Sequence, residues 1–400
     1  MSASPDRRAY LDHAATTPMR PVAVAAMVDL LDDPLGNPTG AHRGARAARK
    51  VIDEARDVMA AALGCLPGEV VFTSGGTEAD NLAVRGVTDA IERSVPLCSA
   101  IERSVPLCSA IEHHAVLDPV LALGGRTVAV DALGRLDLDD LDAQLDESVG
   151  LVSVMLVNNE IGVIQDLAGV AEVLARRAPH AVLHTDAVQA FPWLDVAERA
   201  APAQLVSISA HKFGGPQGVG VLVVRDGTPL SALLLGGGQE RGRRSGTHNV
   251  AGIGAMAAAA SALVAERSAT VARVAALRDR LADSLVAHVP GVVETAVTTD
   301  AEGRPDRSNK VAGSCHLCIE GIESEALLFL LDQVGVAASA ASSCSSGAMD
   351  PSHVLAALGV PRERAQGSLR LSLGATTTDA EVDHAIAAIV DAVARLRRHS

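Results

Sequence analysis

Residues 207–216 read SISAHKFGGP, and this stretch joins two short apolar runs at 205–209 and 219–224. Both runs are bounded by glycine, proline or charged residues, as buried strands usually are. Further strand-like runs lie at 70–73, 151–157 and 181–184, with helical patterns between them such as 167–177. Strands that alternate with helices predict an α/β fold built on a mostly parallel sheet.

The rest of the chain predicts a second, smaller domain. An alanine-rich helical pattern at 250–288 leads out of the α/β region. It is followed by strand-like runs at 317–320 and 369–373 and helical patterns at 324–333 and 378–398. Four hundred residues also exceed what one core usually serves. We therefore expect a large domain at 15–255 and a small α+β domain formed by 1–14 and 256–400.

Composition excludes several classes of protein. The formal net charge of −14 argues against a nucleic-acid groove, because phosphate binding needs clustered basic charge. The N-terminus lacks the apolar stretch of a signal peptide, and the longest uncharged run, 249–265, is too short and too rich in Ala and Gly to span a bilayer. Six scattered cysteines do not suggest a disulfide framework. We expect a cytoplasmic protein that binds neither nucleic acid nor membrane.

The decapeptide IERSVPLCSA occurs twice in tandem, at 91–100 and 101–110. Two copies of so short a unit do not predict a solenoid. The second copy runs directly into IEHH at 111–114, so we expect it to supply the native strand, while the first copy lengthens the preceding helix or loop. A local duplication in a surface connection is one explanation, and an error in the sequence is the other.

Lysine is rare in this chain, which singles out one amine. Only Lys50, Lys212 and Lys310 occur. Lys50 falls in an arginine-rich helical pattern and Lys310 in a predicted loop, whereas Lys212 follows His211 at a strand end, before a Gly-Gly-Pro turn. If an amine of this protein forms a Schiff base, Lys212 is the candidate.

Two further strand ends carry residues suited to a phosphorylated cofactor. Residues 74–78, SGGTE, follow a strand and open a helix, where backbone N–H groups and the Thr77 hydroxyl could hold a phosphate. That pattern alone is common. Asp186 ends another predicted strand, where open α/β sheets place ligand contacts. A carboxylate there could keep the ring nitrogen of an electron-sink cofactor protonated.

With these residues the chain resembles the cysteine desulfurases, which are class-V, fold-type-I pyridoxal-phosphate enzymes. The motifs follow the family order: YLDHAATTP at 10–18, GNPTGAH at 36–42, TSGGTEADN at 73–81, EHHAVL at 112–117, VNNEIG at 157–162, HTDAVQ at 184–189, SAHKFGGPQG at 209–218, GGGQERGRRSGT at 236–247 and RLSLG at 370–374. The resemblance implies a large domain with a seven-stranded, mostly parallel sheet flanked by helices, a small C-terminal domain, and pyridoxal 5′-phosphate as cofactor.

The resemblance also implies a role for each matching residue. Lys212 would carry the Schiff base and then move the proton at the substrate α-carbon. Asp186 would pair with the ring nitrogen, and His113 would stack on the ring and help to move protons. The other implied cofactor contacts are Gly76, Thr77, Asn159, Gln189, Ser209, His211 and Thr247. Thr247 would reach the site of a partner subunit, which implies a homodimer, and Arg370 with Asn159 would bind the substrate carboxylate.

Residues 340–351, AASSCSSGAMDP, place Cys344 among serines and other small residues. Such a run is typical of a loop, and an unremarkable free cysteine is the plain interpretation. The long-loop desulfurases, however, carry their nucleophilic Cys at a similar distance before a Pro-Ser-x-Val-Leu helix start, here Pro351 to Leu355. The resemblance therefore makes Cys344 the nucleophile, on a loop at about 337–350. Where the family often has Gly-Ser-Ala before this Cys, the chain has ASS at 341–343.

The implied reaction removes sulfur from L-cysteine, leaving L-alanine and a persulfide on Cys344. The family passes this sulfur to iron–sulfur scaffold proteins and to tRNA-thiolation enzymes, and Cys344 is implied to contact a nascent iron–sulfur cluster transiently. The alternatives on the same fold are a selenocysteine lyase, a cysteine-sulfinate desulfinase and another class-V aminotransferase, none of which needs a nucleophilic loop cysteine. A non-catalytic scaffold is the alternative from another class.

Overall fold

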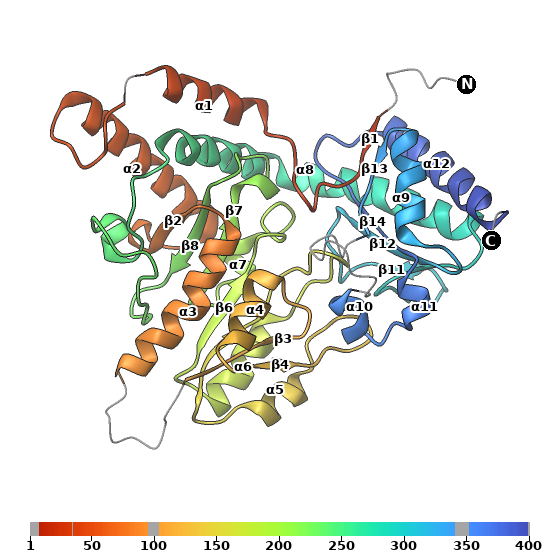
Figure 1. The fold of residues 1–400 in the computed structure, drawn as a ribbon, viewed down its shortest axis with the longest axis horizontal. Coiled ribbons are helices and arrows are strands. Elements are labelled where there is room, and N and C mark those ends of the chain that lie inside the picture. The colour runs from red at the N-terminus through yellow and green to blue at the C-terminus, as the bar shows by residue number, and fades with distance from the viewer. Residues whose placement is uncertain (1–7, 34, 95–103, 341–351, 399–400) are drawn as a thin grey trace.

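The computed structural model describes residues 8–33, 35–94, 104–340 and 352–398 (Figure 1). Its centre is a seven-stranded sheet in the order β2-β8-β7-β6-β5-β3-β4. The strands are β2 Val70–Thr73, β3 Val105–Ser109, β4 Arg126–Val128, β5 Val149–Ser153, β6 Val182–Asp186, β7 Leu205–Ser209 and β8 Gly220–Val224. β8 is antiparallel to both of its neighbours, and the other four pairs are parallel. The predicted fold class, with a seven-stranded and mostly parallel sheet, is confirmed.

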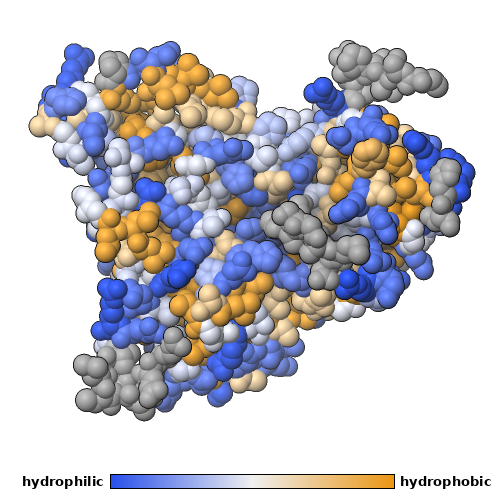
Figure 2. Space-filling model, in the orientation of Figure 1, coloured by the Kyte–Doolittle hydropathy of each residue, from blue (hydrophilic) through white to orange (hydrophobic). Residues whose placement is uncertain are grey.

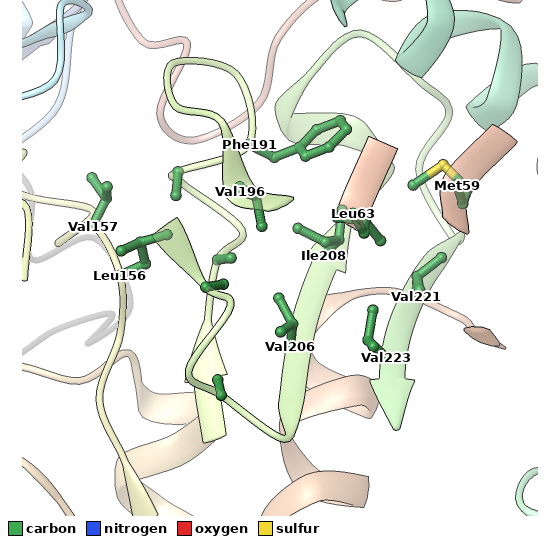
Figure 3. Close-up of a cluster of buried hydrophobic side chains, with 14 of the residues drawn as sticks. Met59, Leu63, Leu156, Val157, Phe191, Val196, Val206, Ile208, Val221 and Val223 are labelled. Atoms are coloured by element: carbon green, nitrogen blue, oxygen red, sulfur yellow. The ribbon is translucent and has the colours of Figure 1, made fainter. Parts of the chain in front are cut away.

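Helices cover both faces of this sheet because successive strand residues point to opposite sides. On β8, Val221 and Val223 belong to one hydrophobic cluster, and Leu222 and Val224 belong to another. Figure 3 shows Val221 and Val223 on the side of Met59, which lies on α2 (Arg43–Leu63). On the other side, α3 (Gly76–Ser94) supplies apolar side chains to the second cluster. The remaining helices around the sheet are α1 Pro21–Asp32, α4 His114–Ala122, α5 Leu138–Gln144, α6 Leu167–Arg177 and α7 Val196–Arg199.

A smaller antiparallel sheet stands beside the large one (Figure 1). Its order is β14-β12-β9, and its strands are β9 Val292–Glu294, β12 Ser314–Ile319 and β14 Ser368–Ser372. The short strands near it are β1 Ala9–Tyr10, which pairs with β13 Val336–Ala337, and the hairpin of β10 Thr298–Thr299 and β11 Pro305–Asp306. Its helices are α9 Ser324–Gln333, α10 His353–Ala357, α11 Arg362–Ala365 and α12 Asp379–Arg397.

One long helix, α8 (Val250–His288), connects the two parts (Figure 1). Ile253 and Leu263 belong to the core of the large sheet, whereas Leu277 and Leu285 belong to the core of the small one. Within the described ranges, α8 is the one helix long and apolar enough to cross a membrane, and 44% of its most apolar window is buried inside the fold. Packing in two cores accounts for its apolar composition. The division into 15–255 and 1–14 plus 256–400 stays a prediction.

Two local expectations can be compared with the structure. The strand expected at 151–157 ends at Ser153, although the N–H groups of Val154 and Leu156 still bond to carbonyls of His184 and Asp186. The chain leaves the sheet there to form the turn that carries Asn159. In the tandem decapeptide, IERS of the first copy ends α3 and VPLCS of the second copy forms β3, as expected, while 95–103 lie outside the described residues.

Candidate active site

The carboxyl ends of the parallel strands lie at one edge of the large sheet. β2, β3, β5, β6 and β7 all end there, because β2 and β7 are each antiparallel to the β8 that separates them. The segments that follow these strands are 74–77, 110–113, 154–159, 187–189 and 210–212. Every predicted cofactor residue except Thr247 lies on one of these segments or at the strand end before it. This edge is where open α/β sheets bind ligands.

A cavity of about 350 Å³ unites the residues predicted to bind a phosphate. Gly76, Thr77, Ser209 and His211 all line it. The first turn of α3 faces it with N–H groups that have no acceptor within the helix, which suits an anion. A Cβ at Gly76 would lie 3.0 Å from Val188 Cγ2, so a side chain there would press against Val188 and shift this turn. The donors and the space fit the phosphate of pyridoxal 5′-phosphate.

Asp186 is a buried carboxylate at the end of β6. Its Oδ1 accepts a hydrogen bond of 2.8 Å from the Val188 N–H. Burial raises the pKa of Asp186 to about 6, although that hydrogen bond and the charge of Lys212 act in the opposite direction. A buried anion with a second oxygen to offer fits the protonated ring nitrogen of the cofactor.

Two more buried carboxyl groups lie near Asp186. Burial raises the pKa of Glu112 to about 8, and its Oε1 accepts from the Ser109 hydroxyl (2.8 Å) and the Met155 N–H (2.7 Å). Burial, and then the charge of Asp186, raise the pKa of Asp80 well above its usual range. Burial therefore favours the protonated form of both groups, and of the three carboxyl groups Asp186 is the one that also has the positive charge of Lys212 to favour its anion.

Lys212 is held by the N-terminal strap, defined here as residues 9–17. Its Nζ donates to the carbonyls of Ala14 (2.6 Å) and Ala15 (2.9 Å). Gln189 Nε2 donates to the same Ala14 carbonyl at 2.7 Å. The strap therefore aims the amine of Lys212 and the amide of Gln189 at one point. With Asn159, these two side chains line a second cavity of about 450 Å³.

His113 is a neutral imidazole with a defined tautomer. Its Nδ1 accepts from the Ala115 N–H at 3.1 Å at the start of α4, so the proton lies on Nε2. Burial, and then the positive charge of Lys212, lower the pKa of His113 to about 4. The structure thus brings the predicted ring-stacking residue into the electrostatic range of the predicted Schiff-base lysine. A neutral ring can both face an aromatic cofactor and exchange a proton.

Arg370 enters from the small sheet, on β14. Its Nη1 donates to the Asn159 carbonyl at 3.1 Å, and its Nη2 pairs with Asp12 Oδ1 at 3.0 Å. Its Nε is buried and, among the described residues, has no hydrogen-bond partner. Within the described ranges, three of the five guanidinium N–H groups are therefore left to bind a carboxylate.

Thr247 is a predicted site residue that the structure describes, and it lines neither of the two cavities. It is exposed, on the segment 236–247 that precedes α8. That segment is tied to the phosphate turn by Arg244, which donates from Nε (2.7 Å) and Nη2 (3.1 Å) to the carboxylate of Glu78. Its role toward a partner subunit stays a prediction.

The conformation of this segment depends on Glu240. Glu240 and Arg241 have φ of 48° and 58°, which costs about 1–3 kcal/mol for each non-glycine residue. The buried Glu240 carboxylate compensates by binding Arg56 (2.7 and 2.9 Å) and His248 (2.6 Å). Burial alone raises its pKa, but the hydrogen bonds from His248 and Arg56 lower it to about 2.

We expect Glu240→Gln to lower the free energy of unfolding at neutral pH by about 3 kcal/mol, because it leaves Arg56 without its buried counter-charge. Since the folded pKa lies below the unfolded value of about 4.3, this contribution is present above that pH and is lost as the pH falls toward 2. Urea unfolding at neutral pH and at about pH 3 measures both values. The exposed Glu54→Gln is the control, with a change within about 0.5 kcal/mol. An equal loss at both pH values would contradict the assignment to the Glu240 charge.

Cys344 lies outside the described residues, so its position is not part of this geometry. The four cysteines of the described ranges, Cys65, Cys108, Cys315 and Cys318, are free. Burial raises the pKa of Cys65 to about 11 and that of Cys315 to about 12. Cys315 and Cys318 are buried on β12, so their CxxC spacing produces no reactive thiolate.

Sequence reasoning missed several residues that the structure places at the site. Asp12, Ala14 and Ala15 contact Arg370 and Lys212, although YLDHAATTP was recognised only as a motif. The polar residues of this motif, which lie just before a turn, could have indicated that it contributes to the site. Lys310 lies in the segment between β11 and β12, as expected of a loop residue, but it is buried, with Nζ 2.9 Å from the Thr295 carbonyl and 3.5 Å from Glu294.

Comparison with known proteins agrees with this geometry. Residues 9–385 match the family Aminotransferase class-V. The chain is 41% identical over 399 residues to the IscS-like cysteine desulfurase of Mycobacterium tuberculosis, covering 98% of this chain and 97% of that protein. It is 36% identical to the cysteine desulfurase IscS of Dictyoglomus turgidum, covering 98% and 96%. The chain belongs to the cysteine desulfurase family.

Solved structures support the same family. A NifS-like protein superposes with a TM-score of 0.86 at 32% identity, covering 97% of this chain and all of that one. The NifS-like protein from Rickettsia africae gives a TM-score of 0.83 at 28% identity, covering 96% and 99%. The predicted family and the predicted fold-type-I architecture of a cysteine desulfurase are thus confirmed.

Proposed function

We propose that this chain removes sulfur from L-cysteine, with pyridoxal 5′-phosphate as cofactor, and leaves L-alanine and a persulfide on Cys344. One observation carries the proposal within this family. The phosphate cradle at Thr77, the buried Asp186 and the amine of Lys212 share one sheet edge, and Arg370 faces them from the second sheet. When bound, the cofactor would supply an electron sink for the substrate α-carbon.

The residues that would hold the cofactor divide into three groups. Gly76, Thr77, Ser209 and His211 offer the phosphate donors of the 350 Å³ cavity. Asp186 offers a carboxylate for the ring nitrogen, and His113 offers a neutral imidazole for the ring face. Asn159 and Gln189 would bond to the ring oxygen and its surroundings, and Thr247 would come from a partner subunit.

The chain's own residues then act on the substrate. Arg370, with Asn159, binds the α-carboxylate and so orients the amino acid. Lys212 takes and returns the proton at the α-carbon, with the carbonyls of Ala14 and Ala15 as its resting acceptors. The Cys344 thiolate attacks the substrate sulfur, which forms an S–S bond and breaks the C–S bond. The electron pair of the C–S bond stays with carbon, which is protonated to give L-alanine.

The functional unit proposed is a homodimer. Apolar side chains stay exposed on α1, with Val24 at 44%, Val28 at 49% and Leu31 at 65% exposed, and Figure 2 shows the apolar surface over this helix. Leu235, on the segment leading to Thr247, is 86% exposed. A second copy that covers these residues would also receive Thr247.

The proposed sulfur acceptors are iron–sulfur scaffold proteins and tRNA-thiolation enzymes, with Cys344 contacting a nascent cluster transiently. The proposed location is the cytoplasm, which the free cysteines of the described ranges support. Neither direct nucleic-acid contact nor membrane contact is proposed.

The native protein should release L-alanine and sulfide in equal amounts from L-cysteine in the presence of a thiol reductant. Alanine and sulfide are quantified in the same reaction, and L-selenocysteine and cysteine sulfinate are offered separately. Turnover of either alternative substrate without turnover of L-cysteine would replace the proposal by a lyase or a desulfinase. Cofactor binding without turnover of any of the three would favour another aminotransferase.

A further inference from the structure

The carboxylate-binding arginine of this site already has a carboxylate beside it. Asp12 Oδ1 lies 3.0 Å from Arg370 Nη2, while Arg370 Nη1 donates to the Asn159 carbonyl. The Arg370 side chain is 6% exposed and that of Asp12 is 24% exposed. The pair is therefore shielded on the arginine side and open to solvent on the aspartate side.

The position of Asp12 is fixed by its neighbours on the strap. Ser372 N–H donates to the Leu11 carbonyl at 2.7 Å, and His13 N–H donates to the Ser372 carbonyl at 3.3 Å, so Asp12 pairs with β14 close to Arg370. The Tyr10 hydroxyl donates to the Thr16 carbonyl at 2.7 Å and closes the turn that follows. These bonds fix the backbone of Asp12. Its partly exposed side chain can still rotate between Arg370 and the solvent.

A resident carboxylate changes the energetics of substrate binding. A guanidinium that is almost fully buried is costly without a counter-charge, so Asp12 stabilises Arg370 while the site is empty. An incoming α-carboxylate needs two parallel N–H groups of the same guanidinium. With Asp12 in place, the α-carboxylate must either share Arg370 with a second negative charge or displace Asp12, and either event lowers its affinity.

We propose that Asp12 is a positioning residue that pairs with Arg370 between turnovers and yields it to the α-carboxylate of the substrate. The proposal rests on the proposed function, because it assigns the carboxylate to an amino-acid substrate. Competition from Asp12 for Arg370 would favour release of the product. When L-alanine leaves, Asp12 returns to Arg370, so the guanidinium is never left buried without an anion. A ligand without a carboxylate gains nothing from displacing Asp12.

The test compares the holoenzyme with its Asp12→Asn variant by calorimetric titration of L-alanine. Asn keeps the shape and one acceptor oxygen but removes the charge, and a neutral hydrogen bond is about half as strong as a charged one. We expect L-alanine to bind about fivefold or more tightly to the variant, with lower KM and lower kcat for L-cysteine. Cysteamine, which lacks the carboxylate, should bind equally to both proteins.

One control and one replacement variant make the result decisive. Asp131→Asn removes a carboxylate that pairs with Arg135 at 2.7 Å and lines neither cavity of the site. This variant should bind L-alanine with unchanged affinity. Asp12→Ser replaces the first variant if that one does not fold, with the same expected gain in affinity. Unchanged or weaker binding of L-alanine to a folded Asp12 variant overturns the proposal. Failure of the native protein to convert L-cysteine would instead overturn the proposed function.

Discussion

Lys212→Ala should lower L-alanine formation from L-cysteine by at least about a thousandfold. Lys212 is the one lysine at the carboxyl edge of the large sheet, so no second amine can bind the cofactor aldehyde or move the α-proton. Lys50 is 74% exposed on α2 and pairs with Glu54, and Lys310 is buried beside Glu294. The fold should survive, because Gln189 still donates to the Ala14 carbonyl when the Lys212 amine is gone.

The measurement follows alanine formation and the visible absorption of the bound cofactor in the two proteins. Lys50→Ala is the matched control and should keep both. Borohydride reduction of the native holoenzyme, followed by peptide mapping, should attach the cofactor to the peptide that contains Lys212. Attachment at Lys310, or substantial turnover by Lys212→Ala, would remove Lys212 from the role assigned to it.

The strands of the large sheet and the site residues at their ends could be predicted from the sequence, because local patterns and strand order determine both. Asp186, Ser209 and Lys212 could be placed at the carboxyl edge because each follows a short apolar run that had to be a buried strand. The carboxyl ends of parallel strands lie at one edge of the sheet, so cofactor residues at those ends are close in space. A sequence that predicts the sheet therefore also predicts that these residues form one site.

Contacts between residues that are distant in the sequence could not be predicted in the same way. Asp12 and Arg370 are 358 positions apart, and no local pattern of either residue points to the other. The burial of Lys310 has the same origin, since its partners Glu294 and Thr295, at the end of β9 and just after it, precede it by 16 and 15 residues. The charge balance of the site therefore depends on tertiary packing, whereas its location depends on secondary structure.

Cys344→Ala should abolish persulfide formation and lower alanine formation from L-cysteine by at least about a hundredfold. The described residues on both sides of Cys344 bear on this expectation. Ser339 exchanges backbone hydrogen bonds with Arg370 (2.7 and 3.2 Å). His353 Nε2 lies 2.9 Å from the Glu112 carbonyl, next to His113.

Cys344 follows Ser339 by five residues (344 − 339), and a fully extended chain spans at most about 3.6 Å per residue. The Cα atom of Cys344 is therefore at most about 18 Å from that of Ser339, whose backbone is bonded to the arginine proposed to hold the substrate. The covalent chain alone keeps this thiol near the site from which it would take sulfur.

The measurement combines alanine formation with mass spectrometry of the peptide that contains residue 344, which in the native protein should gain the mass of one sulfur atom after exposure to L-cysteine. The control is Cys65→Ala, because burial raises the pKa of the Cys65 thiol to about 11 and leaves little thiolate at neutral pH. We expect this control to keep full turnover, and both variants to keep the cofactor absorption, since no predicted cofactor contact changes. If Cys344→Ala retained native turnover, sulfur would leave without this nucleophile, and the chemistry would be that of a lyase on the desulfurase fold. If it lost turnover together with the cofactor, Cys344 would be needed for the structure of the site rather than for sulfur transfer.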